Sequence, residues 1–322
     1  MLYIARLLLL LISGAAYAVD PLPSWNDGAP KKAIIEFVAD VTTDGSKNYV
    51  HPHARIATFD EDGTLWVEQP LYAEFFFAID SVRQLAPQHP DWIDKEPFQS
   101  ILKGDMEAIK NFSRTEIVQL IAATHSDMTI EEFHERVRDW LHKAVHPRFK
   151  KPYPDLVYKP MLEAMQFLRE NQFKIYIVSG GGQEFMRVFA EKLYGIPPSH
   201  IIGTCGKVKY DYRDGHPVLF KLPEVLFIDD KAGKVEGINL FIGKHPLIAF
   251  GNSIGDREML EWTQSNKHKT LELLVHHDDK EREYAYGAES KIGTFSDALM
   301  AESKQKNWIV ISMKDDWKTI FK

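Results

Sequence analysis

The sequence predicts an α/β fold, a doubly wound parallel sheet into which a second, helical domain is inserted. Short apolar runs alternate with helical patterns over most of the chain, as in parallel strands joined by crossover helices. Residues 70–159 break this alternation with helix signals and no convincing strand. The length of 322 residues agrees with this division, because domains of about 150 residues are typical.

The first 18 residues have the pattern of an export signal. Arg6 precedes a short apolar run at 7–12, and small residues follow as far as Ala16-Tyr17-Ala18. A membrane-spanning helix needs about 20 apolar residues, so this run is too short for a stable anchor. We therefore expect cleavage after Ala18 and a secreted or periplasmic mature chain.

The composition excludes several classes of protein. A hydrophobic fraction of 44% and a charged fraction of 26% are ordinary for a soluble globular chain. The net charge of −7 gives no basic excess for phosphate backbones, so we expect no nucleic-acid partner. The single cysteine, Cys205, excludes an internal disulfide and a cysteine-rich metal cluster, and we expect it to be an ordinary buried side chain.

The elements of the α/β part follow from apolar periodicity. After a proline-containing entry segment, a helix is predicted at 32–41. Further helices are predicted at 161–170 and at 183–194, the second ending at Gly195 because glycine commonly terminates helices. Short, continuously apolar runs predict buried parallel strands. The six predicted strands are 56–59, 174–178, 225–228, 247–250, 271–275 and 308–313.

The helical insertion contains its own start signal. Thr129 and Glu132 form a capping-box pattern, which predicts a helix running to about His142. The aromatic run at 75–77 is assigned to the core of the insertion rather than to a substrate contact. The predicted division is a signal at 1–18, an α/β core at 19–69 plus 160–322, and the insertion at 70–159.

The first chemical motif lies directly after the first predicted strand. Asp60 and Asp62 are two residues apart, and Gly63 allows a tight turn. Ligands of open α/β sheets bind at the carboxyl ends of the strands, so both carboxylates should face one crevice. Like charges this close require a cation or a proton between them, and both serve phosphoryl transfer. A plain Asp-Gly turn is the alternative.

Two further motifs follow later strands. Ser179 and Gly180-Gly181-Gly182 could present a hydroxyl and backbone amides to an anion, although a dinucleotide-binding spacing is absent. Lys231 and Lys234 could each neutralise a phosphate. The alternatives are a structural glycine turn and a solvated loop.

A fourth motif follows the strand predicted at 247–250. Asn252 and Asp256 supply the hard oxygen atoms that Mg²⁺ prefers. These four motifs, in this order, resemble the signature of the haloacid dehalogenase-like (HAD) superfamily. The insertion resembles a type-1 cap of its phosphoserine phosphatase branch. That branch usually has an aspartate where Asn252 stands, which implies a weaker metal site here.

The resemblance implies a Mg²⁺-dependent phosphomonoesterase acting on small phosphate esters. Asp60 would attack phosphorus and form an aspartyl-phosphate, while Asp62 would protonate the leaving oxygen and later accept a proton from water. Ser179, Gly180 and Lys234 would hold the phosphoryl oxygens, with Lys234 favoured over Lys231 by its Gly-Lys-x-x-Gly-Ile context. The implied Mg²⁺ ligands are Asp60, Asp62 through its carbonyl, Asn252 and, in a supporting position, Asp256.

Other assignments stay open at this point. A non-catalytic phosphate-ester binding protein or a phosphotransferase of the same fold is the alternative function; a dehalogenase is disfavoured because it would lack the carboxylate of Asp62. Trp66 and Glu68 are candidate substrate contacts from their position alone. His276 and His277 could border the crevice, form a second metal site, or lie in a polar loop.

Overall fold

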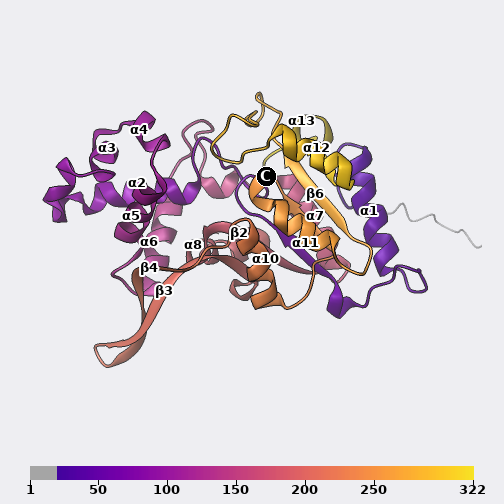
Figure 1. The fold of residues 1–322 in the computed structure, drawn as a ribbon, viewed down its shortest axis with the longest axis horizontal. Helices are drawn as coiled ribbons and strands as arrows, with labels where there is room; N and C mark the ends of the chain where they lie inside the picture. The colour runs from indigo at the N-terminus through magenta and orange to yellow at the C-terminus, as the bar shows by residue number, and fades with distance from the viewer. Residues whose placement is uncertain (1–19) are drawn as a thin grey trace, which may run out of the picture.

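A computed structural model describes residues 20–322, so the predicted signal at 1–18 lies outside the described residues. A seven-stranded sheet forms the core in the order β4-β3-β2-β1-β5-β6-β7 (Figure 1). All neighbouring pairs are parallel except β3 and β4. The strands are β1 (Ile56–Phe59), β2 (Lys174–Gly182), β3 (Ile201–Arg213), β4 (His216–Phe227), β5 (Ile248–Gly251), β6 (Leu271–His276) and β7 (Ile309–Ser312).

Helices cover both faces of the sheet, which confirms the doubly wound fold. Alternate residues of each strand point to opposite faces, so Phe250 and Ala249 pack in different clusters. On one face lie α1 (Ala29–Thr42), α7 (Lys159–Glu170), α8 (Gln183–Arg187) and α9 (Ala190–Tyr194). On the other lie α11 (Arg257–Gln264) and α12 (Asp297–Lys306), and α10 (Ala232–Gly237) packs against α11.

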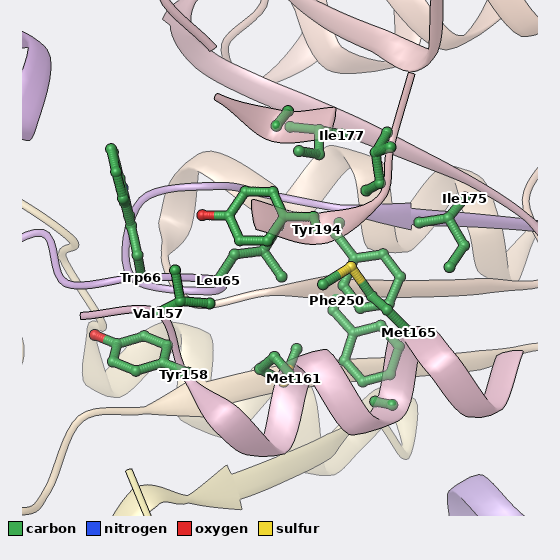
Figure 2. Close-up of a cluster of buried hydrophobic side chains, with 14 of the residues drawn as sticks. Leu65, Trp66, Val157, Tyr158, Met161, Met165, Ile175, Ile177, Tyr194 and Phe250 are labelled. Atoms are coloured by element: carbon green, nitrogen blue, oxygen red, sulfur yellow. The ribbon is translucent and has the colours of Figure 1, made fainter. Parts of the chain in front are cut away.

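The larger cluster anchors the segment that follows β1. Trp66 and Leu65 are buried against Tyr194 and the residues of α7 (Figure 2). The backbone of Tyr158 donates to the carbonyl of Leu65, which ties the start of α7 to the same segment. The motif that begins at Asp60 therefore rests on a closely packed base.

The residues between β1 and α7 are helical. The helices are α2 (Ala73–Leu85), α3 (Phe98–Lys103), α4 (Met106–Lys110), α5 (Arg114–His125) and α6 (Ile130–Lys143), and they lie together beside the sheet (Figure 1). The predicted capping box at Thr129 is present. The Glu132 carboxylate accepts the backbone N–H of Thr129, and the Thr129 hydroxyl accepts the backbone N–H of Glu132. Phe77 is buried between aromatic neighbours, as predicted for the core of the insertion.

The run predicted as a buried parallel strand at 225–228 does lie in a strand at 225–227, but the prediction was wrong about its direction and its burial. These residues end β4, which runs antiparallel to β3, a strand that apolar periodicity did not reveal. Beyond Gly206, β3 and β4 leave the sheet as a hairpin, and its β4 side pairs with the insertion through Thr129 and Phe220 (Figure 1). Outside the sheet, the apolar side chains of this run are exposed rather than buried.

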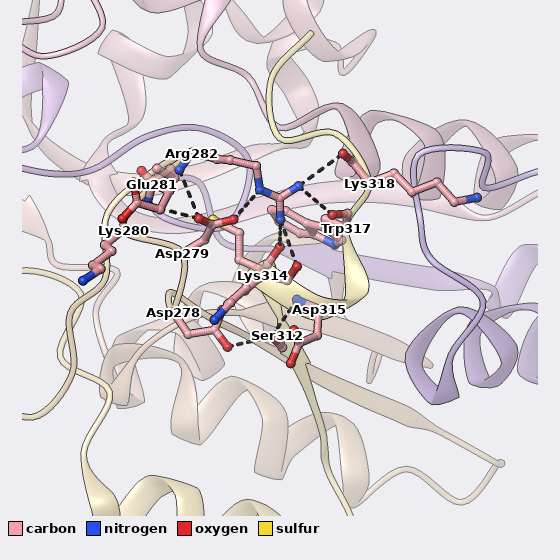
Figure 3. A network of polar contacts seen from close by, with 12 residues as sticks. Asp278, Asp279, Lys280, Glu281, Arg282, Ser312, Lys314, Asp315, Trp317 and Lys318 are labelled. Atoms are coloured by element: carbon pink, nitrogen blue, oxygen red, sulfur yellow. Dashed lines mark hydrogen bonds and ion pairs between the residues drawn. The ribbon is translucent and has the colours of Figure 1, made fainter.

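Arg282 holds the C-terminal segment in place through hydrogen bonds to its backbone. Arg282 donates to the carbonyls of Met313 and Trp317, and its side chain also pairs with Asp279 (Figure 3). The segment after β6 is thereby fixed against α13 (Met313–Asp316). Among residues 20–322, no helix is both long and apolar enough to cross a membrane.

Candidate active site

A cavity of about 750 Å³ lies at the carboxyl end of the parallel strands. Its lining combines core residues, which include Asp60, Asp62, Ser179 and Lys234, with side chains of α2 and α5 from the insertion. This position is the one expected for a ligand site of an open α/β sheet, where the strand order reverses. Three of the four sequence motifs thus contribute predicted site residues directly to one cavity.

Lys234 joins the first and fourth motifs. Its ammonium group lies 2.7 Å from Asp60 Oδ1 and 2.6 Å from Asp256 Oδ1, and the lysine is only 2% exposed. The other oxygen of Asp256 accepts the backbone N–H groups of Asn252 and Ser253. Asp256 therefore holds both the lysine and the loop that carries Asn252.

The alternative lysine lies differently. Lys231 also lines the cavity, but it is exposed, and its ammonium makes no ion pair with any residue between 20 and 322. The geometry therefore favours Lys234 as the cation of the site.

Asp62 is oriented by Trp66. The indole Nε1 donates to Asp62 Oδ1 over 2.7 Å. Asp62 Oδ2 lies on the side of Gly181 to which a side chain would project. Trp66 itself is buried and is absent from the cavity wall, so its assignment as a substrate contact was wrong. Its role is to leave one carboxyl oxygen of Asp62 directed at the cavity.

The glycine-rich segment forms the wall next to Asp62. Ser179 is buried near the end of β2, and its hydroxyl accepts the backbone N–H of Gly181 over 3.3 Å. Gly180 lines the cavity. The N–H of Gly182 donates to Glu74 of α2 over 2.6 Å, and a side chain at Gly182 would collide with that carboxylate. A larger residue at this position would displace the Glu74 carboxylate, so glycine permits this close approach between the insertion and the core.

Asn252 is held by the residue that follows the first motif. Its amide Nδ2 donates to Glu68 Oε1 over 2.7 Å, and its Oδ1 accepts the hydroxyl of Thr64 over 3.2 Å. Tyr286 donates to the same oxygen of Glu68 over 2.6 Å. Gly63 has a φ of 75°, and a side chain there would strike both Asn252 and Glu68.

This pairing makes a prediction for Asn252→Asp in metal-free protein. The new carboxylate would face Glu68 where an N–H now donates, so we expect a loss of about 1–3 kcal/mol of stability that grows as the pH rises. Urea unfolding with a chelator present measures it. The double variant Asn252→Asp/Glu68→Gln restores a donor and should recover most of the loss. Equal midpoints for the single variant and the wild type would contradict the pairing.

The segment after β6 contacts the first motif from behind, which the sequence did not predict. His277 is buried, with Nε2 2.7 Å from the carbonyl of Gly63 and Nδ1 3.1 Å from Glu283, and it stacks on Tyr286. It is therefore part of the packing behind the first motif rather than of a polar loop. His276 ends β6 and pairs loosely with Asp278.

Burial gives the site carboxyls unusual acidities. Desolvation, reinforced by Asp256 and opposed by Lys234, raises the pKa of Asp60 to about 6. Desolvation also raises the pKa of Asp62 to about 7, even though Trp66 donates to it. Asp229, a buried carboxyl without a hydrogen-bond partner among the described residues, has its pKa raised by desolvation to about 7. The positive charge of Lys234 is thus shared among several buried carboxyl groups.

These shifts make the stability of metal-free protein fall with rising pH. The folded-state pKa of Asp62 is about 7, above its ordinary value of 3.8, so its contribution is complete at low pH and is lost as the pH rises through about 7. We expect the urea midpoint to decrease between about pH 4 and pH 7, and Asp62→Asn to make the decrease shallower. A midpoint that rises over this interval would contradict the assignment.

The residues fit a divalent cation by their chemistry. Among residues 20–322, no three His, Cys, Asp or Glu side chains converge as a ready metal cluster. However, Asp60 offers a carboxylate oxygen and Asn252 an amide oxygen, next to buried acids that share one lysine. Both are the hard oxygen ligands that Mg²⁺ prefers. Cys205 is half-buried rather than buried and lies outside the cavity lining.

The comparisons with known proteins identify the family of the chain. A family model described as haloacid dehalogenase-like hydrolase matches residues 57–261. That span begins within β1 and includes all four motifs. No curated protein matches the sequence.

Three solved structures illustrate what the chain matches. A conserved functionally unknown protein from Anaerococcus prevotii is 18% identical with a TM-score of 0.54, covering 86% of this chain and 88% of that chain. A protein of unknown function from Bordetella pertussis is 17% identical with a TM-score of 0.45, covering 80% and 97%. A phosphoserine phosphohydrolase-like protein from Francisella tularensis is 17% identical with a TM-score of 0.39, covering 78% and 98%. At 18% identity, the likeness to the Anaerococcus prevotii protein concerns the fold alone.

Proposed function

Since the chain belongs to the haloacid dehalogenase-like hydrolase family, we propose that it is an exported, Mg²⁺-dependent phosphomonoesterase acting on small phosphate esters. The observation that carries the proposal is the contact of Lys234 with both Asp60 and Asp256 inside a cavity that Asp62 and Ser179 also line. A nucleophilic carboxylate, a second carboxyl that can carry a proton and a fixed cation are what phosphoryl transfer through an aspartyl-phosphate requires.

In the first step, a carboxylate oxygen of Asp60 attacks phosphorus and the bond to the ester oxygen breaks. The leaving oxygen takes a proton from Asp62 Oδ2, the oxygen that Trp66 leaves free. A pKa of about 7 keeps that carboxyl partly protonated near neutral pH, as a general acid requires.

In the second step, water attacks phosphorus of the aspartyl-phosphate and gives its proton to Asp62. Phosphate leaves, and Asp60 regains its carboxylate. The ammonium of Lys234, the hydroxyl of Ser179 and the backbone at Gly180 hold the phosphoryl oxygens from the wall of the cavity.

Mg²⁺ would be held by the carboxylate of Asp60, the carbonyl of Asp62 and the amide oxygen of Asn252, and when bound it offsets the negative charge of the phosphoryl group. Asp256 supports this set from behind, because both of its oxygens are already occupied by Lys234 and by backbone N–H groups.

The enzymatic part is tested with a phosphomonoester panel. Metal-stripped protein should release little phosphate, and activity should return when Mg²⁺ is added. Binding of the esters without any turnover would favour the binding protein, and transfer to an added alcohol in place of water would favour the phosphotransferase.

The export part rests on the sequence of residues 1–18. N-terminal sequencing of the mature protein should begin at Val19. A mature chain that retains Met1 and stays in the cytoplasm would contradict export.

A further inference from the structure

Resting on the proposed function, we propose that the leaving group of the substrate is bulky and apolar, and that it packs between α5 and the end of the β3–β4 hairpin. The phosphoryl group would occupy only the part of the cavity next to Asp60 and Lys234. Two apolar walls line the remainder, and they come from different parts of the chain.

Helix α5 provides the first wall. Ile117, Val118 and Ile121 line the cavity, and their spacing of one, three and four residues places them on one face of the helix. Ile117 is 39% exposed and Val118 is 46% exposed. The neighbouring residue Leu120 is instead fully buried in the core of the insertion. The helix thus has an apolar face beyond the one that its own domain requires.

The end of β4 and the residue after it provide the second wall. Val225 is 43% exposed and Ile228 is 46% exposed, and both line the same cavity together with Pro223. Val225 and Ile228 belong to the run that was predicted as a buried strand. Their apolar character is explained if a ligand covers them, since an apolar lining around a few polar groups is typical of small-molecule sites.

The two apolar walls, Asp60 and Asp62 all line one cavity of about 750 Å³. A small polar leaving group would leave both walls in contact with water. An alkyl or aryl group would cover them and gain the free energy of burying apolar surface. This chemistry selects esters of apolar alcohols over those of short polar ones.

The test compares n-hexyl phosphate with ethyl phosphate. Both are esters of primary alcohols, so the chemical step is matched and the difference lies in the four additional methylene groups. We expect kcat/KM to be at least about tenfold higher for the hexyl ester. Val118→Ser and Val225→Ser should each lower this preference about threefold or more.

The matched control is Leu226→Ser. Leu226 neighbours Val225 on β4 and is 64% exposed, but it does not line the cavity, so rates and preference should match the wild type. Equal kcat/KM values for the two esters, or an unchanged preference in both wall variants, would overturn the inference.

A binding experiment separates this inference from the proposed function. n-Hexylphosphonate and ethylphosphonate cannot be hydrolysed at the P–C bond, and calorimetry measures their affinities. If the protein hydrolyses neither ester but binds the hexyl compound at least about tenfold more tightly, the proposed function fails, while the assignment of the two walls as the binding surface for an apolar group stands. Equal affinities would overturn the inference even if hydrolysis is found.

Discussion

Replacing Asp60 by asparagine should lower kcat/KM for phosphate esters by at least about a thousandfold, because an amide cannot form the acyl-phosphate. The substitution keeps the size of the side chain and an oxygen that can accept from Lys234, which now lies 2.7 Å from Asp60 Oδ1. The fold should therefore survive, and the loss should appear in kcat. Steady-state phosphate release with saturating Mg²⁺ measures it.

Asp230→Asn is the matched control for that experiment. Asp230 also lines the cavity, but it is exposed and lies near Gly180 without a role in the proposed steps. This variant should retain most of the wild-type rate. Comparable losses in both variants would mean that negative charge in the cavity, rather than a nucleophile at Asp60, determines the rate.

Replacing Lys234 by methionine should destabilise the protein by about 3–5 kcal/mol and remove most of its activity, because two buried carboxylates lose their partner. Burial alone would lower the pKa of Lys234, but Asp256 and Asp60 outweigh it and raise that pKa, which shows how strongly the charged form is favoured. Urea unfolding of metal-free protein measures the stability.

Two further variants separate charge from packing. Lys231→Met removes an exposed lysine that directly precedes α10 and should leave stability nearly unchanged. Lys234→Met/Asp256→Asn removes one of the stranded charges and should recover part of the stability without recovering activity. If Lys234→Met alone is as stable as the wild type, the buried ion pairs do not hold the site together.

Much of this site could be predicted because its residues follow strand ends. Asp60, Ser179 and Asn252 each come directly after or at the end of a parallel strand, and parallel strands bring their carboxyl ends to one edge. The order of the short apolar runs is therefore enough to place these residues together at one edge of the sheet.

Other parts of the site depend on contacts that local patterns do not encode. The run at 225–228 is as apolar as a buried strand, yet Val225 and Ile228 line a cavity because β4 leaves the sheet with β3. Glu68 meets Tyr286 across more than two hundred residues, and His277 reaches Gly63 over a similar separation. Neither polar pair has a sequence spacing from which it could have been inferred.

The covalent intermediate at Asp60 is the central claim, and trapping it tests the claim most directly. The protein is mixed with Mg²⁺ and n-hexyl phosphate, quenched in acid during turnover, and digested for mass spectrometry. The peptide that contains Asp60 should carry one phosphoryl group in the wild type and none in Asp60→Asn. Turnover of the ester with no phosphorylated peptide, or with the phosphoryl group on another residue, would contradict the mechanism.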